Sequence, residues 1–208
     1  MKVLLINGSP HKEGCTYTAL CEVAAQLEEQ GILTEIFWIG NSLTSGCIAC
    51  GKCFDKSGKC AINTDKVNEA IEKMKECDGL VVGSPVHFAA ASGNLTAFLD
   101  RMFYAGKMHC AYKPGAAVIS ARRGGTTAAF DQLNKYFTIS NMPLVSSQYW
   151  NMVHGSNPDD VKKDLEGMQT MRTLGKNMAW LIKSIDCAKK NGIDRPAAED
   201  VVRTNFIR

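Results

Sequence analysis

Short apolar segments alternate with longer amphipathic ones along most of the chain. The short segments end in glycine, serine or proline, which is typical of buried strands. They lie at Val3–Ile6, Glu35–Ile39, Leu80–Gly83, Ala116–Ser120 and, more weakly, Leu144–Gln148. In the longer segments apolar residues recur every three or four positions, which predicts helices. These helices are expected over Thr16–Gln30, Thr64–Cys77, Asn94–Tyr104, Thr126–Phe137 and Asp159–Lys190, the first of them ending at Gly31.

Strand and helix therefore alternate five times, which predicts an α/β fold with a parallel sheet covered on both faces. Five strands favour the flavodoxin-like three-layer sandwich, with strand order 2-1-3-4-5, over the six-stranded dinucleotide-binding order. We expect one domain over residues 1–190. It contains a cysteine-rich insertion at 42–63, and a polar tail follows at 191–208.

Composition narrows the class of protein. Of the 208 residues 45% are hydrophobic and 22% charged, which excludes collagen-like and disordered chains. The net charge of +3 is too small to indicate nucleic-acid binding. The apolar run at the N-terminus is shorter than a signal-peptide core, and no run is long enough to span a bilayer. We therefore expect a cytoplasmic protein that has no membrane partner.

The loop after the first strand, Asn7–Thr16, leads directly into a helix. Helix N-terminal amides, together with the hydroxyls of Ser9, Thr16 and Thr18, are suited to an anion. The loop has neither the P-loop nor the G-x-G-x-x-G spacing, so a terminal monophosphate suits it better than a triphosphate. An ordinary strand-to-helix turn with a hydroxyl cap is an equally good interpretation of the loop alone.

Two further loops are expected at the same edge of the sheet. Ligands in this fold bind beyond the carboxyl ends of the strands, where the strand order reverses. The third strand ends in Gly83–Phe88 and the fourth in Ser120–Gly125. Each could be a plain surface turn, but together with the first loop they could enclose a flat ring.

The sequences GSPHKEGCT, GSPVHF and SARRGG of these three loops resemble the FMN-binding loops of the NADPH-dependent FMN reductase family over about residues 1–155. The resemblance implies that FMN is bound. It assigns the phosphate to Ser9, His11, Thr16, Tyr17 and Thr18, the border of the ring to Pro85, Val86, His87 and Phe88, and the cover of the ring to Ala121, Arg122, Arg123 and Gly124. His11 stands where many relatives have arginine, and Cys15 where they often have asparagine.

Four of the nine cysteines, Cys47, Cys50, Cys53 and Cys60, are separated by 2, 2 and 6 residues. Such runs are typical of 4Fe–4S ligation, whereas zinc sites normally use two separated C-x2-C pairs. A 4Fe–4S cluster is therefore the preferred interpretation, with zinc or a reduced, empty loop as alternatives. The compact motif resembles that of iron–sulfur flavoproteins. The other five cysteines are assigned to structure, although the helix N-terminus could lower the pKa of Cys15.

We thus expect an FMN-dependent redox protein that transfers electrons between FMN and a 4Fe–4S cluster, with no catalytic side chain. Its donor would be NAD(P)H, as co-substrate, or a reduced ferredoxin-type protein. The alternatives are an NAD(P)H-dependent reductase of flavin, quinones or nitro compounds without a functional cluster, and a non-enzymatic electron carrier. The family resemblance implies a homodimer or homotetramer. Arg122 and Arg123 could contact reduced flavin or a dinucleotide phosphate, or simply be solvated, and Trp38 and Trp150 are assigned to packing.

Overall fold

The computed structural model describes residues 1–55 and 58–206. Five parallel strands form one sheet in the order β2-β1-β3-β5-β6, and a short strand, β4, pairs antiparallel with β3. Counted along the chain, the parallel strands have the predicted order 2-1-3-4-5, so the predicted fold class is confirmed. The strands are β1 (Lys2–Asn7), β2 (Leu33–Trp38), β3 (Gly79–His87), β4 (Ala90–Ala91), β5 (Gly115–Ala121) and β6 (Met152–His154).

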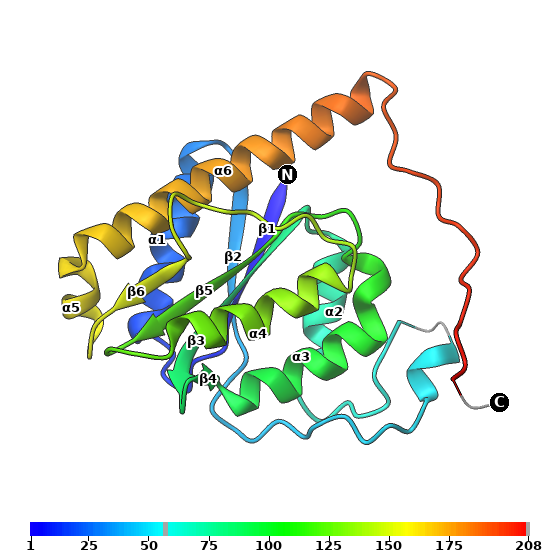
Figure 1. Cartoon of the computed structure of the whole chain (residues 1–208), viewed down its shortest axis with the longest axis horizontal. Helices are drawn as coiled ribbons and strands as arrows, with labels where there is room; N and C mark the ends of the chain where they lie inside the picture. Colours follow the sequence, from blue (N-terminus) through cyan, green and yellow to red (C-terminus); the bar gives the residue numbers. More distant parts are fainter. Residues whose placement is uncertain (56–57, 207–208) are drawn as a thin grey trace.

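Helices cover both faces of the sheet, which gives three layers (Figure 1). One face carries α1 (Cys15–Glu29) and α6 (Leu165–Lys190), with the short α5 (Pro158–Lys163) beside them. The other face carries α2 (Val67–Lys75), α3 (Gly93–Gly106) and α4 (Thr126–Thr138). Two 3-10 turns, η1 (Lys52–Asp55) and η2 (Lys107–His109), lie outside these layers.

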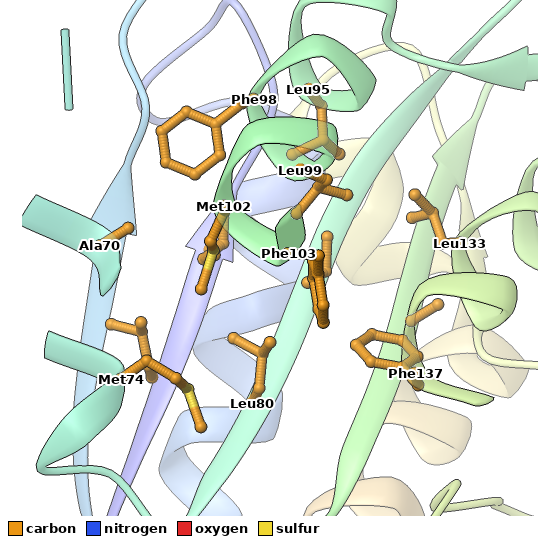
Figure 2. Close-up of a cluster of buried hydrophobic side chains, with 14 of the residues drawn as sticks. Ala70, Met74, Leu80, Leu95, Phe98, Leu99, Met102, Phe103, Leu133 and Phe137 are labelled. Atoms are coloured by element: carbon orange, nitrogen blue, oxygen red, sulfur yellow. The ribbon is translucent and has the colours of Figure 1, made fainter. Parts of the chain in front are cut away.

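The core is divided by the sheet because successive side chains of a strand point to opposite faces. In β1, Leu4 and Ile6 pack on the side of α2, α3 and α4, whereas Val3 and Leu5 pack against α1 and α6. Figure 2 shows the first of these cores, in which Phe103 of α3 and Phe137 of α4 lie above the sheet. Both faces of β1 are buried, so its apolar run is continuous rather than alternating.

The C-terminus of α1 confirms the role predicted for Gly31. This glycine has a φ of +76°, and its N–H bonds to the carbonyl of Glu28 at 2.9 Å. The N–H of Ile32 bonds to the carbonyl of Leu27 at 3.0 Å, which completes a Schellman motif. The helix is therefore fixed at the end opposite the loop that follows β1.

The fifth strand was predicted in the wrong place. Within Leu144–Gln148 only Leu144 forms a bridge, to Gly115, and the fifth parallel strand is β6 instead. Val153 of β6 is completely buried on the sheet, whereas Leu144 is 44% exposed. Both segments lie beside β5, but Leu144 pairs with it at a single bridge, whereas β6 pairs with Ile119 to Ala121.

The predicted helix Asp159–Lys190 is interrupted at Asp164. This residue has a non-helical ψ of 80°, and its carboxylate accepts a hydrogen bond from the N–H of Gly167 at 2.9 Å. Asp164 therefore ends α5 and caps α6. The helix predicted over Thr64–Cys77 is also shorter than expected, because Asp65 bonds to the N–H of Val67 before the helix starts.

Two predicted segments contain residues outside the described part. The insertion 42–63 includes residues 56–57, and the tail 191–208 includes residues 207–208. No helix in the described ranges has both the length and the apolar character needed to span a bilayer.

Candidate functional site

The loop after β1 is organised by Asn7, which is completely buried. The Asn7 side chain donates to the carbonyl of Lys12 at 2.9 Å and accepts from the N–H of Ser9 at 3.1 Å. The N–H of Gly8 bonds to the carbonyl of Gly83 in β3 at 2.9 Å. These contacts hold the loop against the carboxyl end of the sheet and direct the chain into α1.

The N-terminus of α1 is suited to an anion. Gly14 is the N-cap residue, and the first intrahelical bond runs from the N–H of Thr18 to its carbonyl at 3.0 Å. In the described structure no side chain caps this end. The amides of the first turn, Cys15 to Tyr17, therefore remain available where the helix dipole is positive.

The residues predicted to hold the phosphate gather here, but their hydroxyls differ in availability. Ser9 is buried, and its hydroxyl accepts from the N–H of His11 at 3.1 Å. The Thr16 hydroxyl points to the sheet and bonds to that of Ser120 at 2.8 Å. The Thr18 hydroxyl bonds to the Gly14 carbonyl at 3.2 Å. Thr16 thus has its amide, rather than its hydroxyl, to offer a phosphate.

Two other predicted residues lie at the rim of this region. His11 is exposed, so its side chain is free to approach a ligand from solvent. Tyr17 is half-buried, and a hydrogen bond with Cys21 on the next turn is the main cause that raises its pKa. The tyrosine hydroxyl is therefore directed along α1 rather than into the loop.

The turn between β3 and β4 is strained. His87 pairs with Ala90, and the two residues between them, Phe88 and Ala89, have φ values of 51° and 59°. Left-handed backbone costs about 1–2 kcal/mol for each residue with a side chain. The Phe88 ring nevertheless lies fully in solvent, with an exposure of 106%. A two-residue hairpin turn favours left-handed backbone at both positions, and here this backbone presents the Phe88 ring to solvent.

The strained turn packs directly on the glycine-rich loop after β5. Gly125 has a φ of +92°, and a Cβ at this position would lie 2.7 Å from the Cα of Ala89. Arg122, Arg123 and Gly124 precede it and are exposed.

These contacts bring three loops to one edge of the sheet, as expected from the strand order. The first loop bonds to β3 through Gly8 and Gly83, and α1 bonds to the end of β5 through Thr16 and Ser120. We call these loops, residues 8–14, 85–89 and 122–125, the edge loops. Pro85 and Val86 are half-buried at the base of the second edge loop, and Ala121 is buried at the base of the third.

Trp38 is one residue of this region that sequence reasoning assigned only to packing. Its indole N–H donates to the carbonyl of Ser9 at 2.8 Å, so the end of β2 holds the first edge loop. The ammonium of Lys66 donates to the carbonyl of Trp38 at 2.9 Å and lies 5.6 Å from the centre of its ring. No local pattern marks this role, because the partner lies on a distant loop. Trp150, also assigned to packing, is 51% exposed.

The second candidate site lies in the segment between β2 and α2, residues 39–66, which we call the cysteine loop. Its four thiols, those of Cys47, Cys50, Cys53 and Cys60, line one pocket. Cys47 and Cys50 are exposed and the other two are half-buried. Burial raises the pKa of Cys53, and the neighbouring thiols raise it further. In the parts of the chain that the structure describes, no three Cys, His, Asp or Glu side chains are placed to bind a single metal ion.

Arg101 of α3 forms the inner wall of this pocket and is 1% exposed. Its guanidinium makes a two-fold contact with the carboxylate of Asp65. Burial works against its charge, but the hydrogen bonds that Arg101 donates to Asp65 and Cys60 prevail and raise the pKa of Arg101. A charged guanidinium is thus enclosed beside the thiols, which the sequence pattern did not indicate.

Side chains of α2 and α3 also hold the backbone of the cysteine loop. Asn94 accepts from the N–H of Thr44 at 2.6 Å and donates to the carbonyl of Ser42 at 3.2 Å. Asn68 accepts from the N–H of Cys60 at 2.7 Å and donates to its carbonyl at 2.9 Å. The loop is therefore held by asparagine and arginine side chains rather than by a backbone ladder.

The remaining five cysteines differ in burial, since Cys187 is exposed and Cys15 and Cys21 are half-buried. Cys77 and Cys110 are buried, and burial raises the pKa of Cys110 to about 12. The thiol of Cys15 lies 3.6 Å from the carbonyl of Gly155. Burial raises the pKa of Cys15, so the lowering suggested by its place at a helix N-terminus is wrong.

Comparison of the sequence with known proteins shows the family of the chain. The NADPH-dependent FMN reductase family matches residues 1–157. An iron-sulfur flavoprotein of Methanocaldococcus jannaschii is 35% identical over 193 residues, covering 89% of this chain and 99% of its own. An iron-sulfur flavoprotein of Methanosarcina thermophila is 31% identical over 192 residues, covering 89% and 97%.

Comparison of the fold gives the same architecture. RosB, solved with the bound intermediate 8-demethyl-8-formylriboflavin-5'-phosphate, superposes with a TM-score of 0.69 at 14% identity, covering 100% of this chain and 92% of its own. A flavodoxin from the domain Archaea superposes with a TM-score of 0.60 at 14% identity, covering 88% and 99%. At these identities the likeness establishes the flavodoxin-like fold alone.

Proposed function

The chain belongs to the NADPH-dependent FMN reductase family, and from this premise we propose that it is an FMN-dependent oxidoreductase that passes electrons between FMN and a 4Fe–4S cluster in the cysteine loop. The convergence of three edge loops beside the uncapped N-terminus of α1 is the observation that carries the FMN assignment. When bound, FMN supplies both hydride and single-electron chemistry, and a cluster supplies single-electron transfer.

The FMN phosphate is assigned to the first turn of α1 and the first edge loop. The amides of Cys15 to Tyr17 donate to it, and Ser9 and His11 stand beside them. Thr16 contributes its amide, because its hydroxyl is used by Ser120. Thr18 supports the helix start through the Gly14 carbonyl.

The flat ring is assigned to the space between the second and third edge loops. Pro85 to Phe88 border one side, and Ala121 to Gly124 close over the other. Arg122 and Arg123 place two exposed positive charges there, where they favour a reduced, anionic flavin or the phosphate of a dinucleotide. No side chain is assigned as an acid or base.

The donor set of the cysteine loop favours a cluster over a single zinc ion. Zinc sites normally use two separated C-x2-C pairs, whereas three of these cysteines follow one another at C-x2-C-x2-C spacing. All four thiols line one pocket, and such runs are typical of 4Fe–4S ligation. The names of the two archaeal relatives support the same assignment.

The family and the exposed surface bear on the electron donor and on the assembly. The family description favours NADPH, while an exposed cysteine loop is equally suited to a ferredoxin-type donor. We further propose a homodimer or homotetramer, since the fully exposed Phe88 on its strained turn would be covered by a neighbouring subunit.

Anaerobic purification followed by FMN, iron and zinc analysis tests the cofactor assignment. We expect one FMN and about four irons per chain. Cys50→Ser should lose the iron and its visible absorbance while retaining FMN, because the edge loops do not involve this residue. Cys187→Ser, a change at an exposed cysteine outside the cysteine loop, is the matched control and should retain both. Stoichiometric zinc, or a folded protein that refuses added FMN, would contradict the assignment.

Anaerobic reduction of the bound flavin distinguishes the donors. Rapid reduction by NAD(P)H would contradict the carrier alternative, and reduction by ferredoxin alone would contradict an NAD(P)H-dependent reductase.

A further inference from the structure

Cys60 is held more extensively than a loop residue requires. Asn68 of α2 bonds to both its backbone N–H and its carbonyl, as a neighbouring strand would. The Nε of Arg101 donates to its Sγ at 3.3 Å. Backbone and thiol are therefore fixed by two different helices. Cys47 and Cys50 line the same pocket but, by contrast, are exposed.

The guanidinium of Arg101 uses all of its hydrogen-bonding capacity at this point. It has five N–H donors in a rigid plane. One goes to the Cys60 thiol, two go to the Asp65 carboxylate, and the last two go to the carbonyls of Ser45 at 3.1 Å and Ile62 at 2.8 Å. The four contacts to oxygen fix the orientation of the guanidinium plane, and this orientation directs Nε at the Cys60 sulfur.

This arrangement differs from a simple structural ion pair. Asp65 alone would satisfy the charge of a buried guanidinium through its two oxygens. Here the same group also joins the loop before the first cysteine to the loop after the last one, and it presents a charged N–H to a ligand sulfur. Lysine could match the charge but not the geometry, because an ammonium has three donors and no plane.

We propose that Arg101 is a positioning residue for the 4Fe–4S cluster. Arg101 holds Cys60 as the fixed ligand of the cluster and raises the reduction potential of the cluster. A cluster's potential depends on its net charge and on hydrogen bonds to its sulfurs. An N–H bond and a positive charge at one ligand sulfur stabilise the reduced cluster, which carries one more negative charge. The inference rests on the proposed function, since it concerns the cluster assigned there.

The main test compares Arg101→Lys with Asn68→Ala in anaerobically prepared, full-length protein. Iron per chain, FMN per chain and the cluster potential, from a redox titration followed by electron paramagnetic resonance, are measured for each. Arg101→Lys should retain FMN, bind less iron, and shift the remaining clusters to a lower potential. Asn68→Ala should also bind less iron but leave the potential unchanged, because it removes only the backbone contacts. An unchanged potential in Arg101→Lys overturns the tuning role.

A second measurement needs no variant and serves if Arg101→Lys fails to fold. Wild-type protein labelled with 15N in arginine alone is reduced and studied by pulsed electron paramagnetic resonance. We expect a nitrogen coupling to the cluster from the Arg101 Nε. The absence of any 15N coupling overturns the inference while leaving the cluster in place. Wild-type protein that binds no iron at all overturns the proposed function instead, so the two failures are distinguishable.

Discussion

The edge loops and the cysteine loop are held in place by different kinds of contact. The edge loops follow directly from buried strands, and backbone bonds such as Gly8 N–H to the Gly83 carbonyl join them to the sheet. The cysteine loop begins with one backbone bond to β1, from the N–H of Ile39 to the carbonyl of Asn7. Its described residues further along are attached through the side chains of Asn68, Asn94 and Arg101. Most single substitutions leave a backbone bond intact, whereas a side-chain attachment is lost with one residue. We therefore expect the edge loops to tolerate single substitutions better than the cysteine loop does.

Thiol reactivity should show the largest difference between the open loop and the closed core. The pKa of Cys110 is raised by burial from 9.0 to about 12, so at pH 8 its thiolate fraction is about a thousandfold below that of an ordinary thiol. In metal-free, folded protein we expect iodoacetamide to modify Cys47 and Cys50 at least a thousandfold faster than Cys110, as measured by mass spectrometry. The rate at Cys110 should rise about tenfold for each pH unit. In urea all sites should react alike, and rapid labelling of Cys110 in folded protein would contradict its burial.

Gly83→Val should break the first edge loop. A Cβ at this position lies 2.8 Å from Thr16 and 2.9 Å from Leu20, so a larger side chain forces α1 away from β3. We expect the free energy of unfolding to fall by about 3 kcal/mol and FMN to be lost. Urea denaturation and FMN titration measure both effects.

Gly46→Ala is the control in the cysteine loop, where no atom lies within 4 Å of the new Cβ. It should change the free energy of unfolding by less than about 0.5 kcal/mol. Equal effects of the two substitutions would contradict the close packing of α1 on β3.

Trp38→Phe tests a side-chain attachment that joins the end of β2 to the first edge loop. It keeps an aromatic ring but removes the hydrogen bond to the Ser9 carbonyl. We expect FMN affinity to fall about fivefold, equivalent to about 1 kcal/mol, with iron content unchanged. Trp180→Phe, at an exposed tryptophan of α6, should leave the affinity unchanged. An unaltered FMN dissociation constant in Trp38→Phe would remove Trp38 from the site.

Asn94→Ala should have the smallest effect and should act only on the cysteine loop. The substitution removes the hydrogen bonds to Ser42 and Thr44, of which the first is solvent-exposed. We expect about 0.5 kcal/mol less stability and severalfold faster hydrogen exchange at the Thr44 amide. FMN affinity should be unchanged, and a loss of affinity would mean that the two regions are coupled.

The local pattern of apolar and polar residues was sufficient to predict an element where its segment lies in the interior. The buried run of β1 and the spacing of α1 ending at Gly31 are visible in the sequence, because burial on both faces of a central strand leaves few alternatives. The same pattern did not predict the strand at the edge of the sheet correctly. Between Leu144 and Val153 two short segments lie beside β5, and only the second pairs with it over more than a single bridge. It also failed at Asp164, where one side chain starts a new helix within a continuous apolar stripe.

Three features are predictable from the sequence alone: the alternation of strands and helices, the loops that follow β1, β3 and β5, and the spacing of the four cysteines. Each of them depends on residues that are close along the chain. The tertiary structure alone decided that Thr16 turns its hydroxyl to the sheet, that Trp38 holds Ser9, and that Arg101 reaches the thiol of Cys60. Their partners are far away in sequence, 104, 29 and 41 positions respectively. A hydrogen bond depends on where two groups meet in space, and the periodicity of a single segment carries no information about that.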